Sequence, residues 1–485
     1  MRICLVNPPQ VIPIEWGDPF IFQPLGLGYI AAVLEKQHKV KIIDARAEGW
    51  KNVKKLGDRY YLGINYDDIG KEIKAFSPDV VGITVPFSVI AQSAFKVASV
   101  VKDIDRDIIT TLGGPHPTVR PIECASLPYV DFVVIGEGEN TIVELTNALE
   151  NGNLKLMNIK GIAHKAGGKI VITNPRPFIE DLDSIPFPAR HLLPMDIYFE
   201  AAKRGLVAHT SGRRKEPWAS MITSRGCPYQ CTFCSVHLCM GRKYRVRSPE
   251  NVLEEIDLLI RKYKIRHIDF EDDNLTLDKG RMHQICDLII QNGYDIELYT
   301  PNGVRADRLD EDLLRKMQRA GIKELCIGVE SGVQRVVNDI IKKRLDLKKV
   351  EEVVRICKRL DIRVWCFFII GMIGETKEDI KATLRCARKL KKFGANPFFS
   401  IATPYYGTEL YQQAKELGYI REPLNDESLS PANPLIETPE FTVDELREFY
   451  ERAKAMSLTP SRANIIKALK HPKKAIRFLC KKIGL

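Results

Sequence analysis

The sequence predicts an α/β protein: an N-terminal doubly wound, Rossmann-like parallel sheet, then a partial (β/α)6 barrel and a helical C-terminal extension. Three observations indicate this architecture. Short apolar strand patterns alternate with helical patterns over residues 1–150, a Pro-rich span follows, and a second alternation begins near residue 216. Such alternation is typical of parallel sheets covered by helices. With 485 residues and 45% hydrophobic content, the chain is long enough to bury several separate cores.

The first region, residues 1–150, carries a candidate ligand site at the edge of its predicted sheet. The expected strands are residues 3–6, 40–43, 80–84, 108–112 and 132–135, and the expected helices are residues 26–35, 69–76 and 91–102. Doubly wound sheets bind ligands at the carboxyl ends of their strands, where glycine lets backbone approach a ligand closely. Small or turn-forming residues gather at these ends. The candidates are Thr84, Ser88, Gly113, Gly114, His116, Gly136, Glu137 and Gly138.

The alternation is lost between residues 151 and 215, where prolines accumulate, and this span is predicted to be a connector. A second alternation over residues 216–420 predicts the barrel, with chemistry at the carboxyl ends of its strands. The expected strands are residues 219–223, 265–270, 296–300, 324–327, 364–370 and 397–401. Residues 421–485 form the predicted C-terminal extension.

The formal charge of +11 is spread over the chain except at its end. Residues 461–485 combine Lys and Arg with aliphatic residues and contain no Asp or Glu, so they form a basic amphipathic tail. Such a tail suits an anionic membrane surface, although a solvated helix packed on its own domain explains it equally well. A nucleic-acid-binding or RNA-modifying protein ranks last, because no RNA module is recognisable and the core domains lack a basic cluster.

The N-terminal apolar run ends at Pro8, which is too short for a signal peptide, and no apolar stretch has the length of a spanning helix. We therefore expect a cytoplasmic protein. Twelve cysteines in a protein without an export signal favour metal or catalytic uses over disulfides. Most of the cysteines lie in apolar patterns and are expected to pack as small hydrophobes.

Three thiols are different: Cys227, Cys231 and Cys234 lie within eight residues directly after an expected strand. This spacing requires a loop that wraps a metal centre. Three thiolates do not complete a structural zinc site, but they would leave one iron of a cubane cluster open. Cys239 follows five residues later, so a zinc site with Cys239 as its fourth ligand stays open as an alternative.

The CxxxCxxC spacing, with the aromatic Phe233 before the last cysteine, resembles the cluster loop of the radical S-adenosylmethionine (SAM) superfamily. The resemblance implies that Cys227, Cys231 and Cys234 each bind one iron of a four-iron four-sulfur (4Fe-4S) cluster. SAM would chelate the fourth iron through its amino and carboxylate groups. One electron, from an external donor such as flavodoxin or ferredoxin, would cleave SAM to methionine and a 5′-deoxyadenosyl radical.

Residues at the ends of later strands resemble the SAM contacts of the same family. The resemblance implies contacts with the amino group, the ribose and carboxylate, and the adenine, in that order along the chain. The SAM-binding candidates are Phe233, Glu271, Asp272, Asp273, Asn302, Glu330, Ser331 and Gly374. Carboxylates suit an ammonium group, and glycine suits close backbone contact with the base. Taken singly, acids after a strand are more often helix caps than ligands.

The N-terminal region resembles the cobalamin-binding domain attached to one class of radical SAM enzymes, which implies that the eight strand-end candidates contact cobalamin. The general signature of such domains is Asp-x-His-x-x-Gly, whose histidine binds cobalt. Here the matching run is Asp44 to Gly49, with Arg46 in place of the histidine. A charged guanidinium does not ligate cobalt, so we expect cobalamin to bind without a histidine from this motif. His116 is expected to shape its turn or to contact the corrin edge. A domain that retains this fold without binding cobalamin is the alternative.

The leading hypothesis is a cobalamin-dependent radical SAM methyltransferase that methylates an unactivated carbon. The basic tail favours a hydrophobic or natural-product substrate and peripheral membrane contact. The alternative is radical cyclisation, carbon–carbon bond formation or oxidation of a lipid or tetrapyrrole without methyl transfer. No catalytic residue is assigned from the sequence, because in such enzymes the cofactor performs the hard step.

Overall fold

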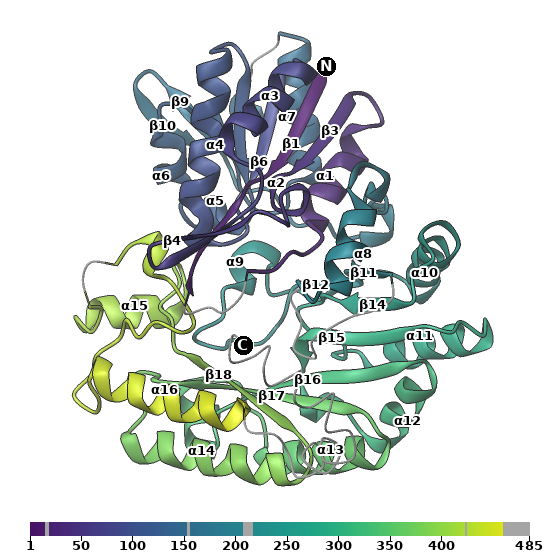
Figure 1. The fold of residues 1–485 in the computed structure, drawn as a ribbon, viewed down its shortest axis with the longest axis vertical. Coiled ribbons are helices and arrows are strands. Elements are labelled where there is room, and N and C mark those ends of the chain that lie inside the picture. The colour runs from purple at the N-terminus through teal and green to yellow at the C-terminus, as the bar shows by residue number, and fades with distance from the viewer. Residues whose placement is uncertain (15–18, 153–155, 207–216, 422–423, 459–485) are drawn as a thin grey trace.

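The computed structural model describes residues 1–14, 19–152, 156–206, 217–421 and 424–458, which form two stacked bodies (Figure 1). The N-terminal body contains a seven-stranded sheet of order β10-β9-β8-β7-β6-β1-β3. Its strands are β1 (Arg2–Asn7), β3 (Lys39–Asp44), β6 (Val80–Thr84), β7 (Ile109–Gly113), β8 (Phe132–Val134), β9 (Ile162–Ala166) and β10 (Lys169–Ile172). Strands β1, β3, β6, β7 and β8 run parallel, which confirms the predicted doubly wound sheet.

Helices cover both faces of this sheet because alternate residues of each strand point to opposite sides. Ile3 and Leu5 of β1 join one core, whereas Cys4 and Val6 join the other. The first core contains residues of α1 (Leu25–Leu34), α7 (Glu139–Glu150) and α8 (Met195–Lys203). The second contains residues of α3 (Tyr66–Phe76), α4 (Ala91–Ile104) and α6 (Pro121–Ser126).

Two features of the N-terminal body were not predicted. Part of the span predicted as a connector forms the β9–β10 hairpin, which pairs antiparallel with β8 and extends the sheet past residue 150. Gly167 and Gly168, both with positive φ, make the turn of this hairpin. A separate antiparallel sheet consists of β2 (Gln10–Pro13), β5 (Arg59–Leu62) and β4 (Val53–Leu56). Strands such as β4 and β10 are short and largely exposed, so their sequences lack a buried pattern that would have predicted them.

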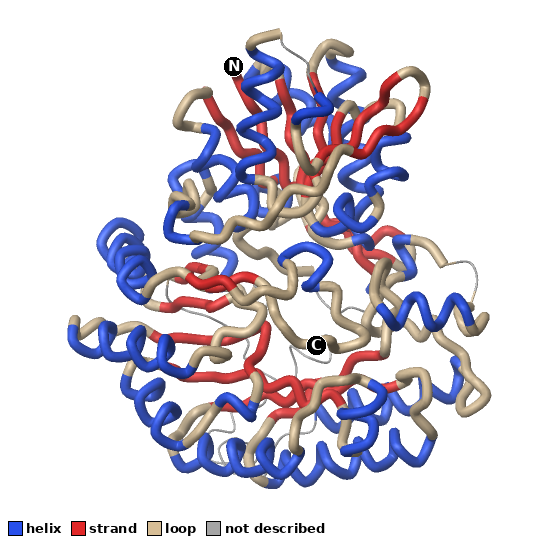
Figure 2. The backbone as a smooth tube through the Cα atoms, turned by 180° about the vertical axis from the view of Figure 1, so that it is seen from behind, coloured by secondary structure: helices blue, strands red, loops and turns tan. Residues whose placement is uncertain are grey.

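The second body is the predicted six-stranded partial barrel, with all neighbouring strands parallel and in sequence order. Its strands are β11 (Trp218–Met221), β14 (His267–Phe270), β15 (Glu297–Val304), β16 (Ile322–Glu330), β17 (Arg363–Ile370) and β18 (Asn396–Ile401). Figure 2 shows the helices on the outer side of this curved sheet. They are α10 (Pro249–Tyr263), α11 (Lys279–Gln291), α12 (Glu311–Arg319), α13 (Leu347–Arg359) and α14 (Lys377–Lys392).

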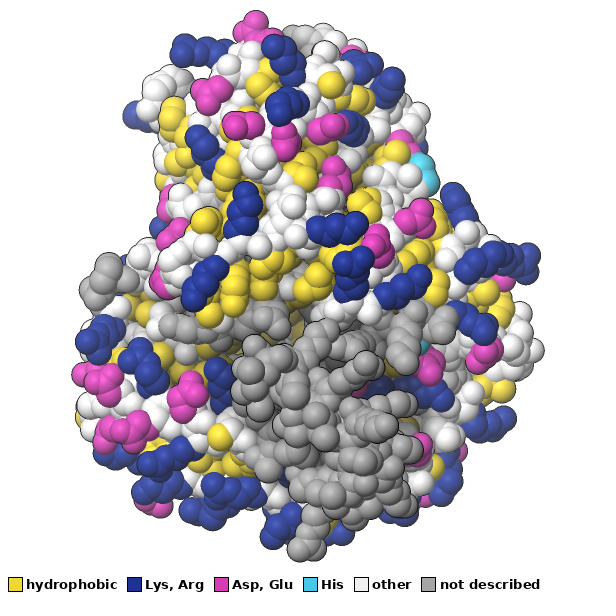
Figure 3. Space-filling view, in the orientation of Figure 1, with side chains coloured by type: hydrophobic (Ala, Val, Ile, Leu, Met, Phe, Trp, Pro, Cys, Tyr) yellow, Lys and Arg dark blue, Asp and Glu magenta, His cyan; other side chains and the backbone are white. Residues whose placement is uncertain are grey.

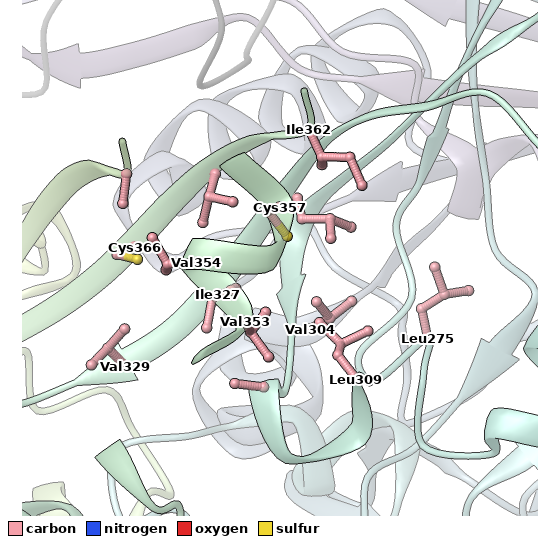
Figure 4. Packing of buried hydrophobic residues seen from close by; sticks show 14 of the residues in the cluster. Leu275, Val304, Leu309, Ile327, Val329, Val353, Val354, Cys357, Ile362 and Cys366 are labelled. Atoms are coloured by element: carbon pink, nitrogen blue, oxygen red, sulfur yellow. The ribbon is translucent and has the colours of Figure 1, made fainter. Parts of the chain in front are cut away.

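The barrel core fills the space between sheet and helices with aliphatic side chains (Figure 4). Cys357 of α13 and Cys366 of β17 are fully buried in this core, as expected of cysteines that pack as small hydrophobes.

The C-terminal extension is helical, as predicted, and contains α16 (Val443–Leu458), which packs beside β18. Helix α15 (Glu409–Glu416) precedes it, within the region predicted as barrel. The basic tail, residues 461–485, lies outside the described residues. Within the described ranges, no helix has both the length and the apolar content needed to span a bilayer. On the face in Figure 3, apolar side chains gather along the waist where the two bodies meet.

Candidate functional site

The loop that carries the three candidate cysteines is closed at its base by a two-stranded sheet. In this sheet β12 (Ser224–Arg225) pairs antiparallel with β13 (Arg245–Val246), so that Arg225 lies opposite Arg245. Gly226 follows with φ of +83°, and a Cβ at this position would lie 2.3 Å from the Lys243 carbonyl oxygen. Only glycine fits this turn. We call residues 226–244 the cysteine loop.

Cys227, Cys231 and Cys234 all line one cavity in the mouth of the barrel, here called the barrel cavity. Burial raises the pKa of the Cys231 thiol, and it raises the pKa of Cys234 to about 12. Neighbouring cysteines contribute to both increases, Cys227 to that of Cys231, and Cys231 and Cys227 to that of Cys234, so the three thiols lie near one another. Buried thiolates require a cation to compensate them, which a metal cluster provides.

The arrangement fits a cluster better than a single ion. In the described part of the chain, no three His, Cys, Asp or Glu side chains converge tightly enough to hold one metal ion. A cubane with its own sulfides spreads its protein ligands over several irons. Cys239 lies on the short helix α9 (Val236–Met240) and lines a different cavity. The alternative zinc site with Cys239 as its fourth ligand is therefore not formed.

The predicted SAM contacts divide into two groups. Phe233, Asp273, Asn302 and Glu330 line the barrel cavity together with the cysteines. Glu271, Asp272, Ser331 and Gly374 are not among its lining residues. The cavity is completed by residues that the sequence analysis did not select: Tyr229, Asn274, Gly303, Val304, Arg305, Gly328, Lys343, Phe367, Phe368, Ile369, Phe398 and Ser400.

Asp272 supports the cysteine loop from behind. Its fully buried carboxylate accepts bonds from the Thr223 N–H at 3.1 Å, from Thr223 Oγ1 at 2.7 Å and from Ser224 Oγ at 2.5 Å. Asp273, by contrast, lines the cavity and accepts one bond from the Gly226 N–H at 3.1 Å. Burial raises the pKa of Asp273 to about 6. Adjacent acids thus have different functions, one structural and one exposed to the cavity.

Ser331 and Gly374 are likewise engaged elsewhere. The Ser331 hydroxyl is buried and lies 3.0 Å from Thr383 Oγ1 of α14. Gly374 packs against Ile340. Glu271 accepts a bond from Ser220 Oγ at 3.2 Å. Strand-end position predicted proximity to the cavity, but the direction of each side chain decides which residues reach it.

Lys343 is the most informative residue that sequence reasoning missed. Its ammonium group lies 2.6 Å from Glu330 Oε1, and both side chains are about nine-tenths buried at the cavity wall. Gly328 makes room for this pair, because a Cβ there would lie 2.5 Å from both charged atoms. Glu330 adopts φ of +68°, a strained conformation for a side-chain-bearing residue. The pair presents one negative and one positive charge to a zwitterionic ligand such as SAM.

The inner face of β17 and β18 adds an apolar wall. Phe367 and Phe398 meet edge to face at 5.8 Å, and Phe398 is 47% exposed although it lies inside the barrel. Ile369 lines the same side of the cavity. Such an exposed aromatic pair is typical of a site that receives an apolar or flat group.

A second cavity lies at the carboxyl ends of the parallel strands in the N-terminal body, and we call it the sheet cavity. Of the predicted cobalamin contacts, those that line it are Thr84, Gly113, Gly114, Gly136, Glu137 and Gly138. The walls are otherwise mainly aliphatic. A Cβ added at Gly26 or Gly136 would meet nothing within 4 Å, so space for a large ligand is open beside the backbone.

Ser88 and His116, also predicted as cobalamin contacts, are not among the residues that line the sheet cavity. His116 Nδ1 lies 2.9 Å from Ser88 Oγ, and its Nε2 lies 3.9 Å from Asp426 Oδ2 of the C-terminal extension. Burial lowers the pKa of His116 to about 4. His116 lies in the short helix α5 (Pro115–Val119), and its imidazole is at the interface of this helix with the extension.

The Asp44–Gly49 run also lies off the sheet cavity. Asp44 caps the short helix α2 (Ala45–Glu48) and accepts a bond from Tyr198. Arg46 is fully buried, with its guanidinium carbon 4.6 Å from the centre of the Phe22 ring. Phe22, not Arg46, lines the cavity. Among the described lining residues there is no histidine.

The cysteine loop separates the two cavities. The three candidate cysteines line the barrel cavity, whereas Cys239 and Met240 of α9 line the sheet cavity. Figure 1 shows α9 between the two bodies. One loop of the chain therefore contributes to both candidate sites.

Comparison with known families supports both sites. The family described as Radical SAM superfamily matches residues 221–387, and the B12 binding domain matches residues 19–146. An uncharacterized methyltransferase of Pyrococcus horikoshii is 35% identical over 93% of this chain and 91% of its own length. Cytidylyl-2-hydroxyethylphosphonate methyltransferase of Streptomyces wedmorensis is 34% identical over 86% of this chain and 82% of its own length.

Solved structures share the fold. The radical SAM methyltransferase TsrM of Kitasatospora setae, with tryptophan and a SAM analogue bound, superposes with a TM-score of 0.66 at 17% identity, over 87% of this chain and 77% of its own. The cobalamin-dependent radical enzyme OxsB, with aqua-cobalamin and SAM bound, gives a TM-score of 0.69 at 19% identity, over 88% of this chain and 63% of its own.

Proposed function

Because this chain belongs to the family of radical SAM methyltransferases with a B12-binding domain, whose cofactors are a 4Fe-4S cluster, SAM and cobalamin, we propose that it methylates an unactivated carbon of an apolar or natural-product substrate. The observation that carries the proposal is the pair of cavities on opposite sides of the cysteine loop. When bound, the cluster and SAM supply the radical that removes a hydrogen atom, and cobalamin carries the methyl group.

The chain's own residues would bind and orient these groups. Cys227, Cys231 and Cys234 would hold the cluster, and Asn274, whose amide nitrogen lies 3.6 Å from Cys227 Sγ, would support the first of these thiolates. Asp273 and Glu330 offer carboxylates to the SAM ammonium group. The strand-end glycines of the sheet cavity would receive the corrin against backbone. The aliphatic walls exclude water from reactive species.

The barrel cavity and two of the relatives support the proposed substrate class. Phe367 and Phe398 offer an aromatic surface to an apolar or planar group. Among the relatives, the hopanoid C-3 methylase of Methylococcus capsulatus is 25% identical and the bacteriochlorophyllide d C-8(2)-methyltransferase of Chlorobaculum tepidum is 24% identical. Both printed names describe methylation of large apolar molecules, in keeping with the proposal.

Radical ring closure without methyl transfer is the competing outcome. The anaerobic magnesium-protoporphyrin IX monomethyl ester cyclase of Rubrivivax gelatinosus is 29% identical, and the match covers 61% of its length. The two methyltransferases described above match at higher identity and over more of their length, which favours methyl transfer.

Anaerobic reconstitution with iron, sulfide and hydroxocobalamin tests the function before the substrate is known. A flavodoxin or ferredoxin system is expected to reduce the enzyme. Incubation with SAM should then release both 5′-deoxyadenosine and S-adenosylhomocysteine, the latter only when cobalamin is bound. Release of 5′-deoxyadenosine alone from cobalamin-loaded enzyme would contradict methyl transfer and favour ring closure or oxidation.

A further inference from the structure

Four buried charged side chains join the sheet cavity to the base of the cysteine loop. Glu137 and Glu139 come from the N-terminal body, directly after the Gly136 turn, and Arg225 and Arg245 come from β12 and β13. Each side chain is less than 10% exposed. The two positive and two negative charges balance, as buried charges require. We call this group the clasp.

Glu137 is the centre of the clasp. Its carboxylate accepts bonds from Arg225 Nη1 at 2.9 Å, from Arg245 Nη1 at 2.8 Å and from the Ile179 N–H at 2.8 Å. Arg225 Nη2 donates to Glu139 Oε1 at 2.6 Å. One side chain thus bonds to both strands that close the cysteine loop.

Each of the two arginines is connected to residues that line a different cavity. Arg225 precedes Gly226, whose N–H donates to Asp273 in the wall of the barrel cavity. Arg245 Nη2 donates at 2.8 Å to the carbonyl of Met240, whose residue lines the sheet cavity. Glu137, Glu139 and Arg225 themselves line the sheet cavity. A ligand that contacts the backbone of residues 136–138 therefore meets the segment that positions the clasp.

We infer that the clasp couples cobalamin binding in the sheet cavity to SAM binding at the cluster, with Glu137 as the positioning residue. The inference rests on the cofactor sites of the proposed function. A corrin in the sheet cavity would contact the segment that carries Glu137 and would restrain its carboxylate and, through it, Arg225 and Arg245. SAM would then bind to a loop base that is more tightly restrained, so that less conformational entropy is lost in the second binding step and the two ligands bind with positive cooperativity. Thermodynamic linkage requires the effect to be equal in both directions.

The test measures affinities in the anaerobically reconstituted full-length enzyme with an oxidised cluster, so that no electron is present to cleave SAM. The dissociation constant of hydroxocobalamin is determined without SAM and with saturating SAM. We expect SAM to tighten hydroxocobalamin binding by roughly 5-fold or more, and hydroxocobalamin to tighten SAM binding by the same factor. In Glu137→Gln both ligands should still bind, but the factor should fall below about 2-fold, since the bonds that order both arginines are weakened.

Glu144→Gln is the matched control. Glu144 lies on α7, as Glu139 does, and pairs with Arg176 of the span predicted as connector, but its side chain is 48% exposed and it does not line either cavity. This variant should keep the native coupling. Glu139→Gln, which weakens only one bond to Arg225, should give an intermediate factor. It also carries the test if Glu137→Gln does not fold.

Each outcome has a distinct meaning. A purely structural clasp would lower the melting temperature of Glu137→Gln while the coupling factor stays native, and that result overturns the inference. Independent binding of the two ligands to the native enzyme overturns it as well. If the native enzyme retains its cluster but no cobalamin, the proposed function fails, and the inference fails with it.

Discussion

The barrel cavity and the sheet cavity hold their candidate cofactors by different physical means. The barrel cavity presents side chains that ligate or carry charge, namely three thiols, Asp273 and the Glu330–Lys343 pair. The sheet cavity presents glycine backbone and apolar surface, its charged lining residues Glu137, Glu139 and Arg225 pair with one another, and none of its described lining residues is a histidine. Ligation depends on the identity of a few side chains, whereas surface fit depends on the shape of many. Single substitutions should therefore abolish the first site, whereas outside the clasp they should act on the second mainly through volume.

The largest expected effect is the loss of one cluster ligand. Alanine at Cys227, Cys231 or Cys234 removes a thiolate for which no replacement lines the barrel cavity among the described residues. Cluster absorbance and 5′-deoxyadenosine release should both fall to background. Cys239→Ala is the control, because Cys239 belongs to the same loop but lines the sheet cavity. SAM cleavage by a variant lacking all three cysteines would refute the radical SAM assignment.

A larger side chain in the sheet cavity should weaken cobalamin binding without affecting the barrel cavity. Gly26 is the second residue of α1 and lines the sheet cavity, and a Cβ added there would meet no atom within 4 Å. Gly26→Trp should therefore fold but fill the cavity and weaken hydroxocobalamin binding by roughly 10-fold or more, while the cluster assembles normally. Gly26→Ala adds only one methyl group and should bind nearly as the native enzyme does. Native affinity in Gly26→Trp would show that the corrin binds elsewhere.

The sequence predicts features that depend on regular patterns or on residue identity better than features that depend on the directions of side chains. Both large sheets and their parallel strands were predicted, because their apolar patterns are long and regular. The cysteines were predicted because three thiols at this spacing are typical of a loop around a metal centre. Lys343 was missed because it follows a π-helical turn, Val336–Ile340, rather than the end of a strand. His116 was expected in a turn but lies in the short helix α5, and the direction of its imidazole could not be predicted because it depends on how this helix packs against the C-terminal extension.

Within the barrel, the adjacent carboxylates of Asp272 and Asp273 are expected to differ in function. Asp272→Asn leaves the donors of Thr223 and Ser224 poorly paired in a buried position, so the free energy of unfolding should fall by about 1–3 kcal/mol. Asp273→Asn should leave stability near native but weaken SAM binding roughly 10-fold, since Asp273 faces the cavity. Chemical denaturation and SAM titration of pre-formed clusters check the two effects. Equal SAM affinities in both variants would contradict the division of functions.

A pH-dependent effect is expected at Asp426 of the C-terminal extension, whose carboxylate lies 3.9 Å from His116 Nε2. Burial and the nearby Glu123 carboxylate raise the pKa of Asp426 from 3.8 to about 6, against the opposing effect of Arg120. A raised carboxyl pKa means that the ionised group destabilises the fold above that pKa, and that the penalty disappears as the pH falls toward the unfolded value. Asp426→Asn should therefore raise stability by about 2 kcal/mol at neutral pH. The gain should shrink steadily as the pH falls from about 6 to about 4, as measured by denaturation at each pH.

Hydroxocobalamin affinity provides the control for this variant. Because His116 and Asp426 do not line the sheet cavity, Asp426→Asn should leave the affinity unchanged at neutral pH. A large loss of hydroxocobalamin affinity would instead indicate that the His116–Asp426 region contributes to the cofactor site.

The smallest expected effect concerns the cobalt ligand, and it separates ligation from surface fit most directly. Electron paramagnetic resonance of the cobalt(II) form should show no splitting from an axial protein nitrogen, because no histidine is among the described residues that line the sheet cavity. Arg46→His restores the histidine of the Asp-x-His-x-x-Gly signature, yet it should also give no nitrogen splitting. Arg46 lies behind the ring of Phe22, so an imidazole at that position stays outside the cavity. Nitrogen splitting in the native enzyme would reveal a ligand from elsewhere in the chain, whereas splitting that appears only in Arg46→His would show that the Asp44–Gly49 segment moves to the corrin when cobalamin binds.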